Sequence, residues 1–243
     1  MKLYLFPFAG GNSNYYMSWK QRFNSQVEVE PIELSGRGRR IAEPLYSSIS
    51  EAVQDLYELL RVDQVSTDSP YAFFGHSMGG LIAYELYYKL LENNEKPPVH
   101  LFLSGVKPPH LERKRRNITQ LTDEELMEEV VNLGGTPQEL VDNKELLDYF
   151  LPIIRSDFKI VEEYEFKEKG TKVACPISIL NGKDDRFDLG EIEQWRNYTD
   201  RSAAIHYYSG DHFYLNQNMQ ELVAYMEHTL AQYEKRNTEI TFS

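Results

Sequence analysis

The chain has 243 residues, of which 41% are hydrophobic, 13% aromatic and 26% charged. These fractions are close to the globular average and exclude a disordered, collagen-like or disulfide-scaffold protein. Because a domain has roughly 150 residues, one large domain, or a compact domain with an insertion, fits this length better than two independent modules. The formal net charge of −12 argues against binding of a nucleic-acid backbone as the main activity.

The single cysteine and the first residues of the chain indicate the compartment. Cys175 alone cannot form an internal disulfide or a cysteine-rich metal site, so a reducing cytosol is the simplest compartment. The apolar run after Met1 is interrupted by Pro7, which makes it shorter than the ~7–15 residues of a signal-peptide core. No stretch approaches the ~18 uninterrupted apolar residues of a membrane span. We therefore expect a cytoplasmic protein that binds neither nucleic acid nor a membrane.

Short apolar, β-rich runs alternate with longer amphipathic runs, which is typical of a parallel sheet covered by helices on both faces. The predicted strands are Leu3–Phe6, Val27–Ile32, Tyr71–Phe74, His100–Ser104, Ile177–Leu180 and Ala204–Tyr208. The predicted core helices, in which apolar residues recur at helical spacing, are Ser50–Arg61, Leu81–Leu91 and Gln220–Tyr233. The sequence thus predicts an α/β fold.

The alternation of strands and helices breaks between residues 107 and 171. This segment has no convincing strand and is far longer than the usual connection between two core elements. Thr122 followed by Glu125 is a capping box, and Asn143 is placed to cap a helix over Lys144–Phe150. We interpret residues 107–171 as a helical lid, inserted between residues 1–106 and 172–243 of a single core domain.

The strongest local signal is the G-H-S-M-G sequence at Gly75–Gly79. This G-x-S-x-G pattern follows an apolar strand and opens a helix, which is the context of a nucleophile elbow. The glycines remove side chains that would collide where the strand turns into the helix. Ser77 is then exposed at the carboxyl edge of the sheet, where a helix N-terminus favours negative charge. We predict that Ser77 is a nucleophile; a turn serine is the alternative.

A nucleophilic serine needs a base that is oriented by a third group. In the elbow fold these partners follow in the order Ser, acid, His, each after a later strand. N-G-K-D-D follows the fifth predicted strand, and S-G-D-H-F follows the sixth. His212 is therefore the predicted base, while Asp184 and Asp185 are both candidates for the acid. The other histidines are interpreted as packing or surface residues, with a position at the site entrance as the alternative for His110: His76, His100, His110, His206 and His228.

Acyl transfer also requires an oxyanion hole. The backbone N–H of Met78, directly after the nucleophile, is one predicted donor, and the P-F-A-G-G loop after the first strand supplies the second. In this loop we favour the Ala9 N–H, with Phe8 as the alternative. Gly10 and Gly11 allow close approach of the backbone to a ligand, although they are also compatible with a simple flexible turn.

Two basic clusters stand out in this acidic chain. One contains Arg37, Arg39 and Arg40, and the other is the run Arg113–Arg116. Such clusters are most often solvated, and the alternative is contact with a phosphate or an acidic partner near the mouth of the site. Cys175, just before a predicted strand, is interpreted as structural.

These residues resemble the stand-alone, type II thioesterases that accompany nonribosomal peptide and polyketide synthetases. The motifs that carry the resemblance span nearly the whole chain: L-F-P-F-A-G-G at Leu5–Gly11, S-G-R-G-R-R-I-A-E-P at Ser35–Pro44, F-F-G-H-S-M-G-G at Phe73–Gly80, L-G-G-T-P at Leu133–Pro137, N-G-K-D-D at Asn181–Asp185 and G-D-H-F at Gly210–Phe213. Two features depart from the family. Ser35 replaces the usual proline, and Met1 lies almost directly before the first motif strand, so we expect the first strands of a full hydrolase sheet to be missing.

The resemblance implies an α/β-hydrolase fold with a helical lid, and the triad Ser77, Asp185 and His212, since the family's acid is the second aspartate of N-G-x-D-D. It implies an acyl or aminoacyl thioester on the 4′-phosphopantetheine of a carrier protein domain, which is then the partner. We expect a monomeric enzyme without a cofactor or metal of its own that clears mis-primed synthetases. The alternatives are an acyl-CoA or fatty-acyl carrier thioesterase or carboxylesterase of the same fold, a non-catalytic binding module, and a structural partner of the synthetase.

Overall fold

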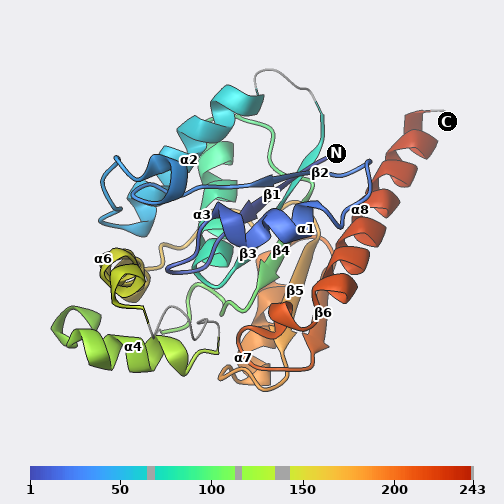
Figure 1. Ribbon diagram of the computed structural model, residues 1–243. Helices are drawn as coiled ribbons and strands as arrows, with labels where there is room; N and C mark the ends of the chain where they lie inside the picture. The colour runs from blue at the N-terminus through green and yellow to red at the C-terminus, as the bar shows by residue number, and fades with distance from the viewer. Residues whose placement is uncertain (65–68, 113–116, 135–142, 242–243) are drawn as a thin grey trace.

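The computed structural model describes residues 1–64, 69–112, 117–134 and 143–241 (Figure 1). Within these ranges six parallel strands form one sheet in the order β2-β1-β3-β4-β5-β6. The strands are β1 (Lys2–Phe6), β2 (Glu28–Pro31), β3 (Tyr71–His76), β4 (His100–Ser104), β5 (Ile177–Gly182) and β6 (Ala203–Tyr208). All six predicted strands are confirmed, and their ends differ from the prediction by two residues at most.

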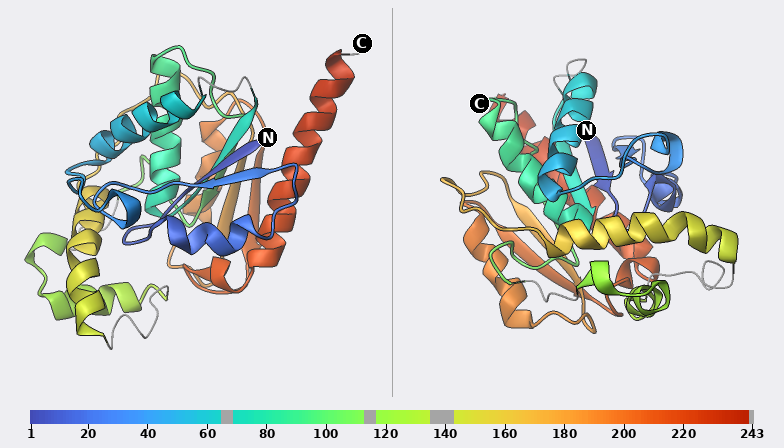
Figure 2. Two further views of the ribbon diagram at one scale, coloured as in Figure 1. Left: turned by 45° about the horizontal axis from the view of Figure 1, so that its top comes forward. Right: turned by 90° about the vertical axis from the view of Figure 1, so that its left-hand side faces the viewer.

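Helices cover both faces of the sheet, as predicted. Helices α2 (Ile49–Gln64) and α3 (Met78–Glu92) pack on one face, while α1 (Met17–Lys20) and α8 (Met219–Thr241) pack on the other (Figures 1 and 2). Because successive side chains of a strand point to opposite faces, Phe73 joins the core beneath α3, whereas Phe74 packs against Trp19 of α1. Two apolar layers therefore enclose the central strands.

The sequence missed the shortest helices. Helix α1 has four residues and α7 (Leu189–Glu193) has five, which is too short for a helical period to be recognised. Several single 3₁₀ turns were also not predicted: Ser13–Tyr16, Gly38–Arg40, Ile118–Gln120, Gln194–Tyr198 and Tyr214–Asn216. In the ranges that the structure describes, each helix is too short or too polar to span a bilayer.

The helices described within residues 107–171 lie beside one end of the sheet (Figure 2). Helix α4 (Asp123–Val131) begins with the predicted capping box, in which the Glu125 N–H donates to Thr122 Oγ1 at 3.2 Å and the Thr122 N–H donates to Glu125 Oε2 at 2.8 Å. Asn143 caps α6 (Lys144–Glu162), as predicted. The described part of this segment contains helices and no strand.

Helix α6 is longer than predicted. It does not end at Phe150 but continues through Pro152 to Glu162. A proline inside a helix usually costs roughly 3 kcal/mol. Here, burial of the neighbouring apolar side chains offsets this cost, because Leu151 and Ile154 pack with residues of α4 in a separate apolar cluster. The extra length carries Asp157 and Phe158 to the loop after β1 and to the cavity described below.

His100 in β4 makes the stability of the fold depend on pH. Its ring is buried with Nε2 at 2.8 Å from Ser178 Oγ, and burial lowers its pKa to about 4. Below about pH 6.5 the unfolded chain binds a proton at this position that the native chain does not. We therefore expect the free energy of unfolding to fall as the pH drops from 6.5 towards 4, by up to about 1.4 kcal/mol per pH unit from this group.

Urea unfolding of the wild type and of His100→Asn, measured between pH 7.5 and pH 4.5, checks this expectation. The variant should lose less stability than the wild type on acidification, whatever its stability at pH 7.5. Parallel curves for the two proteins would show that His100 does not contribute.

Candidate active site

The residue that joins β3 to α3 is Ser77, with φ 55° and ψ −114°, a conformation that residues other than glycine rarely adopt. The flanking glycines make the turn possible. A Cβ atom on Gly75 would lie 2.1 Å from the Gly79 carbonyl oxygen, and one on Gly79 would lie 2.1 Å from that of Phe6. The Ser77 N–H donates to the Ser104 oxygen at 2.7 Å, which holds the strained residue in place. This geometry is that of a nucleophile elbow.

The loops after β5 and β6 bring an acid and a histidine together. His212 Nδ1 lies 2.8 Å from Asp185 Oδ2, and the two side chains are 4% and 0% exposed, respectively. Because a carboxylate only accepts hydrogen bonds, Nδ1 carries the proton and Nε2 is left as a base. Asp184 instead lies exposed at the surface. Of the two candidate acids, Asp185 is therefore the one that the structure pairs with His212.

A second buried imidazole lies beside His212. The ring centroids of His76 and His212 are 4.9 Å apart, and His76 Nδ1 is 2.8 Å from Ser104 Oγ. Burial, and next the charge of His212, lower the pKa of His76 well below its ordinary value. His76 therefore stays neutral when His212 binds a proton, and it does not oppose an imidazolium there. Its interpretation as a packing residue agrees with this burial.

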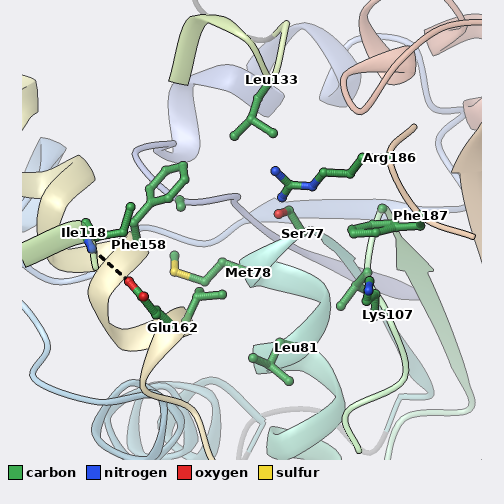
Figure 3. Close-up of a pocket in the computed structure, with 14 residues that line it drawn as sticks. Ser77, Met78, Leu81, Lys107, Ile118, Leu133, Phe158, Glu162, Arg186 and Phe187 are labelled. Carbon is green, nitrogen blue, oxygen red and sulfur yellow. Dashed lines mark hydrogen bonds between the residues drawn. The ribbon is translucent and has the colours of Figure 1, made fainter. Parts of the chain in front are cut away.

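A cavity of about 410 Å³ lies at the elbow, and Figure 3 shows the Ser77 hydroxyl among the side chains that line it. Ala9, Ser77 and Met78 share its lining, so the predicted nucleophile and both predicted oxyanion donors belong to residues of one cavity. Phe8, the alternative donor, packs its ring against Phe213 with centroids 4.8 Å apart. The apolar walls come from α3, from the loop after β4 and from residues 107–171: Leu81, Val106, Ile118, Leu133, Phe158 and Val161.

Charged side chains at this cavity were not predicted. Lys107 and Arg186 line it, and Figure 3 shows both on the same side of Ser77 as Phe187. Lys107 Nζ lies 2.8 Å from a carboxylate oxygen of Glu191. Both cations follow closely after the carboxyl end of a parallel strand, where ligands bind in open α/β sheets. Their position just after a predicted strand is the feature of the sequence that could have identified them as residues of the site.

The first basic cluster is not an open positive surface. Arg37 is 1% exposed and forms a two-pronged ion pair with Asp157 of α6. Arg40 donates to both carboxylate oxygens of Asp55 at 2.8 Å, so only Arg39 of this cluster is exposed. The favoured interpretation, a solvated cluster, is wrong for Arg37, which is buried. The alternative, contact with a phosphate or an acidic partner, is wrong for Arg37 and Arg40, because carboxylates of the same chain already neutralise them.

Two sequence features lie wholly or partly outside the described residues. They are the second basic cluster, Arg113–Arg116, and the end of the L-G-G-T-P motif at Leu133–Pro137, of which only the first two residues are described. The described part of the motif contributes Leu133 to the cavity.

Two further residues lie apart from the elbow. His110 is exposed and stacks on Tyr198, with ring centroids 5.7 Å apart, so it packs on that ring instead of lining the cavity at Ser77. Cys175 is buried, and burial raises its pKa to about 12. A thiol with this pKa is not a nucleophile at neutral pH, which agrees with a structural role.

Comparison with known proteins identifies the family. Residues 1–231 match the family described as Thioesterase domain. Linear gramicidin dehydrogenase LgrE of Brevibacillus parabrevis is 36% identical over 95% of this chain and 88% of its own length. Although that name describes a dehydrogenase, the dinucleotide fingerprint G-x-G-x-x-G does not occur in this sequence.

Two solved structures share the fold closely. ClbQ of the colibactin pathway has a TM-score of 0.90 and 34% identity, covering 96% of this chain and 98% of its own. The type II thioesterase BorB of the borrelidin cluster has a TM-score of 0.84 and 30% identity, covering 93% of this chain and 91% of its own. The chain therefore belongs to the thioesterase family, as a thioester hydrolase of the α/β-hydrolase fold and of the type II group found in nonribosomal peptide and polyketide pathways.

Proposed function

We propose that this enzyme hydrolyses acyl and aminoacyl thioesters from the 4′-phosphopantetheine arm of carrier domains and so regenerates mis-primed synthetases. The observation that carries the proposal is that Ala9, Ser77 and Met78 line one cavity and that His212 is hydrogen-bonded to Asp185. Membership of the type II thioesterases supports the choice of a carrier-bound substrate. Residues 107–171, which supply part of the cavity wall, act as the lid over the acyl group.

In the first half of the reaction, Ser77 attacks the thioester carbonyl carbon. His212 Nε2 takes the hydroxyl proton, while Asp185 holds Nδ1–H and stabilises the imidazolium. The neutral ring of His76 adds no opposing charge. The negative charge that develops on the carbonyl oxygen is bound by the N–H groups of Met78 and Ala9, with the N-terminus of α3 favouring it.

Loss of the thiolate completes the first half and forms the acyl-enzyme, and hydrolysis of the acyl-enzyme in the second half regenerates the serine. The tetrahedral intermediate collapses, the C–S bond breaks, and the pantetheine thiolate leaves with the carrier. Because a thiol has a pKa of about 8.5, it departs far more readily than an amine, so protonation by His212 matters less than in a protease. His212, after passing the proton that it took from Ser77 to the departing sulfur, removes a proton from water, and the resulting hydroxide attacks the acyl-enzyme carbonyl. The second tetrahedral intermediate then collapses as His212 returns this proton to Ser77 Oγ, which releases the free acid.

The apolar walls also favour a second candidate. Leu81, Val106, Phe158 and Val161 would accept a fatty acyl chain as readily as a short acyl group. A fatty-acyl carrier or acyl-CoA thioesterase would use the same elbow and the same pair. The two candidates differ in whether the carrier domain contributes to recognition and in the length of acyl chain that is hydrolysed fastest.

A comparison of substrates tests the proposal. The enzyme is incubated with acetyl-loaded carrier domain, acetyl-CoA and a soluble aryl ester, and then with carriers that bear acyl groups of increasing length. We expect kcat/KM to be highest for the short acyl group on the carrier. A higher kcat/KM for either soluble substrate would overturn the proposed editing role, and a maximum at long chains would favour the fatty-acyl candidate.

A further inference from the structure

A buried ion pair joins helix α6 to the core beside the elbow. Arg37 Nη1 and Nη2 donate to Asp157 Oδ2 and Oδ1 at 2.5 and 2.7 Å, and both side chains are 1% exposed. Removing two charges from water is costly unless their remaining hydrogen-bonding groups are also satisfied. The other hydrogen bonds of Arg37 and Asp157 therefore show which segment of the chain the ion pair holds in place.

The partners in those bonds belong to the loop after β1. The Gly10 N–H donates to Asp157 Oδ2 at 2.8 Å, and Arg37 Nη1 donates to the Gly11 oxygen at 3.1 Å. A second contact comes from one turn earlier in α6, because a Cβ atom on Gly10 would lie 2.7 Å from Ile154 Cγ1. The ion pair and Ile154 of helix α6 thus contact the loop at two neighbouring residues, Gly10 and Gly11.

The loop so held is a tight turn. The Gly11 N–H donates to the Phe8 oxygen at 2.9 Å, and Gly10 has φ +78°, which are the closing bond and the third-position φ of a type II turn. The peptide group between Ala9 and Gly10 is the central one of this turn. If it flipped, the Ala9 carbonyl would face the Asp157 carboxylate in place of the Gly10 N–H. Repulsion between these two acceptors selects the observed orientation.

The closed turn determines the direction of the proposed oxyanion donor. The Phe8 oxygen and the Ala9 N–H belong to the same planar, trans peptide group and point in opposite directions. Because the Phe8 oxygen points into the turn towards Gly11, the Ala9 N–H points out of it. Ala9 also lines the cavity at Ser77.

We propose that Asp157, oriented by Arg37, is a positioning residue for the oxyanion hole: by accepting from the Gly10 N–H it anchors the closed turn at Phe8–Gly11 to helix α6, and the closed turn presents the Ala9 N–H to the reacting carbonyl. The second oxyanion donor is then complete only when α6 is seated on the core. This inference rests on the proposed mechanism at Ser77. It assigns to α6 a part in the chemical step besides its part in the cavity wall.

The test compares two changes at the pair. Asp157→Asn keeps an acceptor of the same shape but removes the charge. The double variant Arg37→Met with Asp157→Leu removes both charges together, and replacement of a buried ion pair by apolar side chains is often neutral or stabilising. The matched control is Asp123→Asn, which breaks the ion pair of α6 between Arg155 and Asp123 at 2.7 Å without touching the turn.

Kinetics with the loaded carrier, the thermal midpoint and the rate of fluorophosphonate labelling of Ser77 are measured for each protein. Because oxyanion donors act in the transition state, we expect kcat to fall about 10- to 100-fold in the double variant, with little change in KM. Labelling should slow in parallel, since it also places negative charge on an oxygen at this site. Asp157→Asn should lie between the double variant and the wild type, and Asp123→Asn should keep the wild-type kcat.

A folded double variant with wild-type kcat and labelling rate would overturn the inference, as would a rise in KM alone. If the double variant does not fold, a folded Asp157→Asn variant with wild-type kcat and labelling rate would overturn the inference instead. The labelling rate does not depend on which thioester or ester the enzyme prefers. Failure of the carrier-substrate proposal therefore leaves this test intact, and wild-type labelling in both variants would reject the positioning role alone.

Discussion

Replacement of Ser77 by alanine should lower kcat for a loaded carrier by about 10⁴-fold or more. The variant loses the nucleophile that forms the acyl-enzyme, whereas the cavity walls and the Met78 and Ala9 N–H groups remain. KM should therefore change little. Alanine at this position keeps the strained φ of 55°, so the thermal midpoint serves to show that the elbow is still folded.

Labelling separates this role from a purely structural one. A fluorophosphonate should form an adduct at Ser77 in the wild type and none in Ser77→Ala. Hydrolysis by the variant at the wild-type rate, or an adduct at another residue, would reject Ser77 as the nucleophile. Absence of any adduct in the wild type would favour the non-catalytic binding module.

The two neighbouring aspartates provide the second large effect. Asp185→Asn should lower kcat by about 10³- to 10⁴-fold, because an amide that donates towards His212 Nδ1 favours the tautomer with its proton on Nε2 and removes the base. Asp184→Asn should retain almost the full wild-type kcat, since that side chain is exposed and the structure pairs His212 with Asp185.

Single-turnover release of the acyl group from a loaded carrier measures both variants under the same conditions. The pair forms a matched control, because the same change of charge and shape is made at adjacent positions of one loop. Equal losses in the two variants, or an active Asp185→Asn, would contradict the assignment of the acid.

Where the sequence predicted the fold correctly, the information was local. The central strands are buried on both faces and therefore appear as short continuous apolar runs, as at Tyr71–Phe74. The elbow needs glycines at fixed offsets from Ser77, because strand and helix backbones approach within a few ångströms there. His212 was found for a related reason: loops after parallel strands all end at the same edge of the sheet.

The acid shows the limit of this reasoning. Periodicity and turn chemistry treat Asp184 and Asp185 alike, and only the resemblance to a family distinguished them. The structure distinguishes them physically, because the Asp185 carboxylate is turned inward to His212 and is fully buried. A difference of one residue in a loop decides which side chain faces the core, and local sequence does not encode that choice.

Contacts between distant segments were not accessible in the same way. The sequence pattern predicts that Arg37 belongs to a solvated or docking cluster, yet Arg37 is buried against Asp157, 120 residues further along the chain. Nothing in S-G-R-G-R-R distinguishes an exposed arginine from a buried one, since the distinction depends on a carboxylate that α6 delivers. The continuation of α6 past Pro152 likewise depends on packing with α4, which only the folded chain provides.

The strands of the sheet, the elbow at Ser77 and the loop that carries His212 can all be predicted from the sequence, because each depends on residues within a few positions of one another and on the constant geometry of parallel strands. The folded chain is needed to see that Asp185 lies against His212, that Lys107 and Arg186 line the cavity, and that Asp157 accepts from the turn at Phe8–Gly11. Burial and pairing of charges depend on which segments pack together, and the strength of a charge pair depends on how far the fold excludes water from it.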